Sequence, residues 1–276
     1  MHQGRERLAA AGIEQAAWEA EQLLVERMGG NYAQLVMVED REPKAEFAAS
    51  YMEWIERRAT REPLQHILGH WPFLELDLKT DRRALIPRPE TEDMAVFARS
   101  LVPDDRARLA LDIGTGTGCI ALALAYANKR LKVIATDVSD DALQLAQENA
   151  KATGLSSRVT FLRGKLLEPL SPDTRADLIV ANLPYVGSDE MPHLQPEVRD
   201  HDPRLALVAA DGGMMLISTL IAGAPQRLAP GGALLLEHSP SQAGRVAAAL
   251  RHHAYVEIAT HNDRFGRLRW TVARVP

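Results

Sequence analysis

The chain has 276 residues, of which 46% are hydrophobic and 25% charged, a balance typical of a globular protein with one large or two modest domains. Its formal net charge of -5 argues against nucleic acid as the main ligand, because nucleic-acid-binding proteins usually carry an excess of basic residues. The single cysteine, Cys119, excludes an intramolecular disulfide, and no apolar run is long enough to cross a bilayer. We therefore expect a cytoplasmic protein that makes no use of a membrane or of direct nucleic-acid binding.

The first part of the chain has the composition of a small helical bundle. Apolar residues recur at helical spacing over Glu14–Met28 and again over Lys44–Thr60. Leu64–Leu68 is expected to add a short further helix, and Gly29-Gly30 is expected to end the first one. These features predict a helical N-terminal domain over residues 1–71.

A change of pattern follows this helical region. Pro72–Leu78 alternates in part between apolar and polar residues, which predicts a strand, and Ala84–Ile86 is its expected partner. We interpret residues 72–86 as a β-hairpin linker. The run Pro87–Glu92 then breaks the chain and begins a helix with acidic residues in its first turn.

Strands and helices alternate from Leu109 onward, which predicts a parallel α/β sheet. The expected strands are Leu109–Ile113, Lys132–Asp137, Val159–Arg163, Ala176–Asn182 and Gly232–Glu237. The expected helices are Cys119–Asn128, Ser139–Thr153, Met214–Leu228 and Gln242–His253. Tyr255–Thr260 and Leu268–Ala273 are joined by a short turn and are expected to pair antiparallel. The predicted fold of residues 87–276 is α/β, with a Rossmann-like sheet that ends in an antiparallel strand.

A glycine-rich turn, Gly114-Thr115-Gly116-Thr117-Gly118, joins the first of these strands to its helix. Glycines let a ligand approach the backbone closely, and the helix N-terminus adds free N–H groups. Asp137 ends the next strand, where a carboxylate can accept both ribose hydroxyls of a nucleoside. The spacing differs from a dinucleotide fingerprint and resembles the S-adenosylmethionine methyltransferases. The alternative is a glycine turn that binds no ligand.

The tetrapeptide Asn182-Leu183-Pro184-Tyr185 follows the fourth strand, at the edge where ligands of open α/β sheets bind. The side-chain oxygen of Asn182 and the carbonyl of Leu183 are two acceptors that can hold the two hydrogens of a planar –NH2 group. Tyr185 can pack on the flat face of that group. The pattern therefore predicts methyl transfer to a planar nitrogen without a strong general base. The alternative is a strand-ending turn with no catalytic role.

With these motifs in place, the chain resembles the protein-(glutamine-N5) methyltransferases that modify peptide chain release factors. The segments that carry the resemblance are Glu62–Gly69, Leu85–Glu92, Leu111–Ala123, Asn182–Tyr185, Asp202–Leu207 and Leu234–His238. The resemblance implies S-adenosyl-L-methionine as donor, S-adenosyl-L-homocysteine as product, and the glutamine of a Gly-Gly-Gln loop in class 1 release factors as acceptor. It further implies that the N-terminal domain docks the release factor, and we expect the protein to act as a monomer.

Carried over by position, the resemblance also implies roles for single residues. The residues expected to contact the cofactor are Gly114, Thr115, Gly116, Thr117, Gly118, Asp137, Leu166 and Asn182. The glutamine side chain is expected to lie against Asn182, Leu183, Pro184 and Tyr185. No metal is expected, because the nine histidines show no metal-ligand spacing with acids or cysteines.

The chain departs from the family pattern at two places near this site. The family has a proline where this chain has Leu183, so the carbonyl acceptor is kept without the fixed φ of proline. The family has an acid and an aromatic residue near the adenine, where this chain has Lys165 and Leu166, which removes an acceptor and a stacking ring.

Several readings stay open at this point. Arg88, Glu90 and Glu92 are either a salt-bridged helix start or substrate-facing groups. The acceptor could instead be a ribosomal-protein glutamine, or an adenine N6 in nucleic acid, because Asn-Leu-Pro-Tyr also resembles rRNA adenine dimethyltransferases. A chain that kept the fold but lost cofactor binding would be a non-catalytic module.

Overall fold

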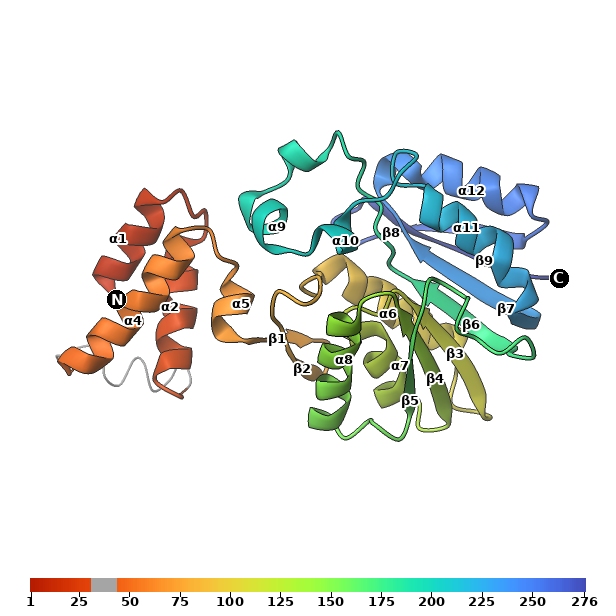
Figure 1. Cartoon of the computed structure of the whole chain (residues 1–276), viewed down its shortest axis with the longest axis horizontal. Helices are drawn as coiled ribbons and strands as arrows, with labels where there is room; N and C mark the ends of the chain where they lie inside the picture. The colour runs from red at the N-terminus through yellow and green to blue at the C-terminus, as the bar shows by residue number, and fades with distance from the viewer. Residues whose placement is uncertain (31–43) are drawn as a thin grey trace. The chain divides into compact units, whose positions relative to one another are not determined.

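A computed structural model describes residues 1–30 and 44–276 of the chain (Figure 1). The chain divides into two compact units. The first consists of Met1–His70 with Gln195–His201, and the second of Trp71–Leu194 with Asp202–Pro276. The predicted helical domain includes residues 31–43, which lie outside the described part. Within the described residues, no helix is both long and apolar enough to span a bilayer.

The first unit is a bundle of helices. Its members are α1 (His2–Ala10), α2 (Ala16–Arg27), α4 (Ala45–Ala59), α5 (Leu64–Leu68) and α9 (Pro196–His201). The helices expected over residues 14–28, 44–60 and 64–68 are confirmed, whereas α1 and α9 were not predicted as helices. Leu8, Leu23 and Ile55 are fully buried between α1, α2 and α4, which accounts for the apolar stripes in the sequence.

Ion pairs attach α9 to the rest of this unit. Glu197 of α9 accepts from Arg58 of α4 at 2.8 Å and from Arg61 at 2.8 Å. Arg58 is 5% exposed and also donates to Glu19 of α2. A short helix distant in sequence is therefore held by side-chain contacts to the N-terminal helices.

The predicted β-hairpin exists, but its strands differ from those expected. β1 (His70–Phe73) and β2 (Leu76–Lys79) form a two-stranded sheet that spans the stretch predicted as one strand, Pro72–Leu78, and extends beyond both of its ends. Leu74 has a φ of +53°, so it turns the chain where continuous alternation predicted extension. The predicted pairing with Ala84–Ile86 is wrong, since these described residues form no strand and instead line a cavity in the second unit.

The second unit is built on a seven-stranded sheet of order β5-β4-β3-β6-β7-β9-β8. Its strands are β3 (Arg108–Ile113), β4 (Leu131–Asp137), β5 (Val159–Arg163), β6 (Ala176–Ala181), β7 (Leu228–Glu237), β8 (Val256–Asn262) and β9 (Leu268–Arg274). The first five of these pair in parallel, and β9 is antiparallel to both β7 and β8. The predicted Rossmann-like sheet with an antiparallel terminal strand is confirmed.

Alternate residues of the strands face two separate layers of helices. Ala110 of β3 packs with α6 and α7, whereas its neighbour Leu111 packs with α11 and α12. Because both faces are covered, the central strands are mostly apolar, as Leu178–Ala181 of β6 and Ala233–Leu236 of β7 show. The helices of this unit are α6 (Pro89–Leu101), α7 (Cys119–Ala127), α8 (Asp140–Ala152), α10 (Arg204–Leu207), α11 (Met215–Gly223) and α12 (Ala243–His252). Short 3-10 helices lie at Met191–His193, Ala224–Gln226 and Pro240–Gln242.

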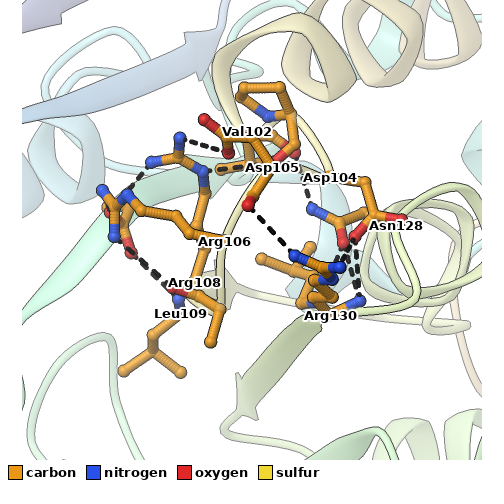
Figure 2. Close-up of polar contacts among 12 residues, drawn as sticks. Val102, Asp104, Asp105, Arg106, Arg108, Leu109, Asn128 and Arg130 are labelled. Carbon is orange, nitrogen blue, oxygen red and sulfur yellow. Dashed lines mark hydrogen bonds and ion pairs between the residues drawn. The ribbon is translucent and has the colours of Figure 1, made fainter.

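Polar side chains hold the amino-terminal ends of β3 and β4 in place (Figure 2). Asn128 is 4% exposed; its amide nitrogen donates to the Val102 carbonyl at 2.8 Å, and its oxygen accepts from the Leu131 amide at 3.0 Å. Asp177 accepts from the Leu109 amide at 3.0 Å and from Arg106. These contacts hold the amino-terminal ends of the central strands, at the end of the sheet opposite to the cavity described below.

Candidate active site

The central feature of the second unit is a cavity of about 300 Å³ at the carboxyl ends of the strands. The strand order reverses between β3 and β6, and such a reversal creates a crevice where ligands bind. Ile113 pairs with Ala181, so the next residues, Gly114 and Asn182, lie side by side. The predicted site residues that line the cavity are Gly114, Thr115, Gly116, Thr117, Asp137, Leu166, Asn182, Leu183 and Pro184. Gly118 and Tyr185 adjoin these residues in the chain and are outside the lining.

The glycine turn has a backbone that other residues rarely adopt. Gly114, Gly116 and Gly118 have φ of +75°, +55° and +82°. A Cβ on Gly118 would lie 3.1 Å from the Cβ of Ala146 in α8, and one on Gly114 would lie 3.0 Å from a methyl group of Leu183. The glycines therefore allow α7, α8 and the tetrapeptide to close around one turn.

Buried Asp112 anchors this turn from the end of β3. Its Oδ2 accepts from the Thr115 hydroxyl at 2.6 Å and from the Ala121 amide at 3.1 Å. Burial raises the pKa of Asp112 to about 6, although both hydrogen bonds favour the charged form. The carboxylate thus joins the strand, the turn and helix α7.

Asp137 ends β4 beside the turn. Its Oδ2 accepts from the Gly116 amide at 2.9 Å and its Oδ1 accepts from the Ser139 amide at 3.0 Å. Each carboxylate oxygen has a further lone pair, so an oriented acceptor remains for hydroxyl groups of a ligand. The mainly apolar cavity, with this one fixed carboxylate, fits a nucleoside.

Lys165 and Leu166 line the next part of the cavity, after β5. Leu166 has a φ of +51°, and its carbonyl accepts from the Thr136 hydroxyl at 3.0 Å. Lys165 is exposed and offers donors but no acceptor. The departure from the family pattern therefore lies in the wall of the cavity itself.

The tetrapeptide is held by side chains from two other elements. The amide nitrogen of Asn182 donates to the Thr91 hydroxyl of α6 at 3.0 Å, and Thr91 donates to Oε2 of Glu237 at 2.8 Å. The Tyr185 hydroxyl donates to the other oxygen of Glu237 at 3.4 Å. The chain of contacts orients Asn182, and it directs the hydroxyl of Tyr185 toward Glu237.

The main chain of Tyr185 is fixed separately. Gln242 donates from its amide nitrogen to the Tyr185 carbonyl at 2.8 Å and to the Gly212 carbonyl at 2.9 Å. A Cβ on Gly213 would lie 1.9 Å from the Tyr185 carbonyl oxygen, so only glycine permits this approach.

Glu237 is the most unusual carboxylate near the site. It is 2% exposed, and burial raises its pKa to about 7. The Thr91 hydroxyl and the charge of Arg269 lower that pKa, while Glu90 raises it. Thr91 and Glu237 lie within the family segments Leu85–Glu92 and Leu234–His238, but the sequence predicts no role for either side chain. No local sequence pattern could connect the two residues, because they lie 146 residues apart in the chain.

The charged residues at the start of α6 form ion pairs. Glu90 pairs with Arg267 at 2.9 Å, and Glu92 pairs with Arg264 at 3.1 Å. Arg88 lines the cavity and pairs with buried Asp202, whose pKa is raised by burial to about 6. Glu90 and Glu92 thus form the salt-bridged helix start that was one of the two predicted alternatives. Arg88 forms an ion pair too, but it also lines the cavity.

Cys119 also lines the cavity, but its thiol is not activated. Burial raises the pKa of the Cys119 thiol to about 12, which leaves it protonated at neutral pH. Among the described residues, no group of three or more His, Cys, Asp or Glu side chains is arranged to hold a metal ion.

Comparison with known proteins gives consistent matches over both units. Residues 1–69 match the family model of the PrmC N-terminal domain, and residues 110–201 match that of a methyltransferase domain. A release factor glutamine methyltransferase of Deinococcus radiodurans is 40% identical over 272 residues, covering 99% of this chain and 96% of that protein. One of Streptomyces coelicolor is 37% identical over 276 residues, covering 99% and 95%.

Solved structures share the fold at low sequence identity. The hMettl16 catalytic domain, in complex with MAT2A 3'UTR hairpin 6, has a TM-score of 0.60 at 19% identity, covering 80% of this chain and 81% of that one. The 16S rRNA N2 G1207 methyltransferase RsmC of T. thermophilus, in complex with AdoMet and guanosine, has a TM-score of 0.54 at 20% identity, covering 75% and 50%. The names of the sequence relatives do not favour a ribosomal-protein or nucleic-acid acceptor. With relatives at 37–40% identity along almost its entire length, the chain belongs to the release factor glutamine methyltransferase family.

Proposed function

We propose that the protein transfers a methyl group from S-adenosylmethionine to the side-chain nitrogen, N5, of the glutamine in the Gly-Gly-Gln loop of class 1 release factors. The observation that carries this proposal is the adjacency of Gly114 and Asn182 at the ends of neighbouring strands, within one cavity. A cofactor turn and a pair of amide-binding acceptors thus meet at one point. The names of the relatives supply the substrate class.

We assign the cofactor to the part of the cavity between the glycine turn and Leu166. The turn Gly114–Gly118 would face the amino-acid portion of S-adenosylmethionine, Asp137 its ribose hydroxyls, and Leu166 its adenine. The bound cofactor supplies a methyl group on a positively charged sulfur, which is open to in-line attack by a nucleophile. The residues of the chain hold the cofactor, exclude water and orient the acceptor.

We assign the acceptor amide to the tetrapeptide. The Asn182 side-chain oxygen and the Leu183 carbonyl would accept the two hydrogens of the glutamine –NH2 group, while Pro184 and Tyr185 border its flat face. Fixing both hydrogens aims the nitrogen at the methyl group. The cofactor held by the glycine turn would supply the methyl group to this nitrogen, with S-adenosylhomocysteine as the leaving group, and the amide nitrogen would release one of its two protons. Positioning of this kind is worth several kcal/mol of the barrier.

The remaining parts of the proposal concern the whole protein. The N-terminal helical domain, residues 1–71, would dock the release factor, residues 72–86 would link the domains, and residues 87–276 would carry out the transfer. We propose a monomer that acts in the cytoplasm and does not bind nucleic acid directly, consistent with the net charge of -5.

Transfer of a radioactive methyl group to an intact release factor tests this function. We expect label on the wild-type factor and none on a factor whose loop glutamine is replaced by alanine. Equal labelling of the two factors, or labelling of neither, would contradict the proposal.

A further inference from the structure

We propose that Thr91 and Glu237 are positioning residues for Asn182. The Thr91 hydroxyl donates its hydrogen to Glu237 and accepts a hydrogen bond from the Asn182 side-chain –NH2 group. The Asn182 side-chain oxygen is thereby turned toward the glutamine nitrogen that receives the methyl group. The catalytic part of this inference rests on the proposed function. The three side chains come from α6, the end of β7 and the end of β6, so the tertiary structure alone brings them together.

The distances define a continuous chain of hydrogen bonds. Asn182 donates to Thr91 at 3.0 Å, and Thr91 donates to Glu237 at 2.8 Å. Thr91 and Glu237 are each 2% exposed, so the hydrogen bond between them is shielded from bulk water. Asn182 is less buried and lines the cavity.

The direction of each hydrogen bond follows from the chemistry of the groups. A hydroxyl has one hydrogen, and an ionised carboxylate can only accept, so the Thr91 hydrogen is committed to Glu237. Only oxygen lone pairs of Thr91 then face Asn182, which must present its –NH2 group to them. The opposite orientation of the Asn182 amide would place two acceptors against each other. The amide oxygen is therefore left for the cavity, where a glutamine –NH2 group needs an acceptor.

Protonation of Glu237 would remove this constraint. A protonated Glu237 can donate to Thr91, and the Thr91 hydrogen can then turn toward the Asn182 oxygen, which allows the amide to reverse. Burial raises the pKa of Glu237 to about 7. The groups that face it are Glu90 and Thr91 of α6, Cys119 of α7, Tyr185 after β6, and Arg269 of β9. Arg269 and the hydroxyls of Thr91 and Tyr185 favour the charged form of Glu237, whereas Glu90 disfavours it. Because protonation of Glu237 releases the Asn182 amide, methyl transfer is expected to decline as the pH falls through the pKa of Glu237.

Variants of Thr91 separate orientation from simple packing. Thr91→Val keeps the shape but loses the hydroxyl, and we expect kcat to fall by about tenfold to a hundredfold, with the KM for release factor and the Kd for S-adenosylmethionine within about threefold of wild type. Thr91→Ser restores the hydroxyl and should recover most of the rate. Thr219→Val, on an exposed face of α11, is the matched control and should leave kcat unchanged. Equal rates for wild type and Thr91→Val would overturn the inference.

The pH profile gives a readout that packing alone would not move. Wild-type kcat should fall on the acidic side of about pH 7, whereas Glu237→Gln should show no such decline. An unchanged acidic limb in Glu237→Gln would assign the ionisation to another group and refute the role of Glu237.

A measurement that needs no methyl transfer keeps this inference distinct from the proposed function. In ¹⁵N spectra of the wild-type protein, the side-chain N–H signals of Asn182 should shift with a midpoint near pH 7, and they should stay constant in Glu237→Gln. Signals that do not titrate in the wild type would sink the inference even if the enzyme is active. Signals that titrate in a protein that labels no release factor would sustain it while the proposed function fails.

Discussion

At the scale of single residues, one contact shows how the chain accommodates its departure from the family tetrapeptide. Leu183 replaces a proline, whose ring would fix φ. The Leu183 side chain is instead 4% exposed and packs on Gly114, where a Cβ would meet it at 3.0 Å. Packing of Leu183 against the glycine turn thus restrains the tetrapeptide, in place of the proline ring that fixes φ in the family. The backbone carbonyl of residue 183 is kept as a hydrogen-bond acceptor.

Lys165 is the residue at which binding of the cofactor can be improved. Lys165→Asp would place an acceptor in the cavity wall at the position where the family has an acid. A hydrogen bond to a charged acceptor contributes about 1.5–3 kcal/mol, so we expect S-adenosylmethionine to bind about tenfold more tightly. Calorimetric titration measures this change, and Lys165→Ala controls for loss of the lysine charge. Equal affinity of the aspartate and alanine variants would place the adenine elsewhere.

Glu237 also predicts a dependence of stability on pH. Burial raises the pKa of Glu237 to about 7 in the folded protein, from the 4.5 of an unperturbed glutamate, so between these pH values the folded state binds more protons than the unfolded state. The free energy of unfolding therefore falls as the pH rises through this window, by about 3 kcal/mol in total at 1.36 kcal/mol per pKa unit.

Urea unfolding of wild type and Glu237→Gln at pH 4.5 and pH 8 isolates this contribution. The variant lacks the ionisation, so its stability relative to wild type should increase with pH. A difference between the two proteins that does not change with pH would show that Glu237 titrates normally.

At the scale of elements, the sequence was most informative where a helix or strand carries its own signals. β5 and α5 have the bounds predicted, and Ser139 caps α8 by accepting from the Ala142 amide at 3.2 Å. The glycine turn and the tetrapeptide were found because each follows a strand. The hairpin was misassigned because alternation cannot show the turn at Leu74, and α9 was missed because its six residues are too short to be helical without tertiary contacts.

The stability of α9 can be tested through its ion pairs. Glu197→Gln leaves Arg61 without its carboxylate and Arg58 with Glu19 alone, and we expect a loss of about 1–3 kcal/mol in the helical unit. Hydrogen exchange of the amides of residues 196–201 should accelerate. Asp200→Asn is the control, because Asp200 pairs only with its exposed neighbour Arg199 among the ion pairs of the described residues. Equal exchange in both variants would show that α9 does not depend on Glu197.

At the scale of the whole molecule, the chain passes between its two units at three points: after His70, after Leu194 and after His201. The segment that enters the helical unit, Gln195–His201, therefore begins ten residues after Tyr185, and the chain returns to the second unit at Asp202, the partner of Arg88. The chain therefore enters the first unit shortly after the tetrapeptide and leaves it directly before Asp202, which is paired with a residue of the cavity wall. This topology arises from contacts distant in sequence, which no local pattern could have shown.

The central claim is that one cavity brings a cofactor turn and the Asn182 tetrapeptide to a single glutamine nitrogen. Mass spectrometry of the Gly-Gly-Gln loop peptide, cut from a class 1 release factor after incubation with enzyme and S-adenosylmethionine, tests it most directly. We predict the addition of one methyl group on the glutamine with wild-type enzyme, and no measurable addition with Asn182→Ala, which should also bind the cofactor less tightly. A methyl group on another residue, or the same yield from Asn182→Ala, would contradict the claim.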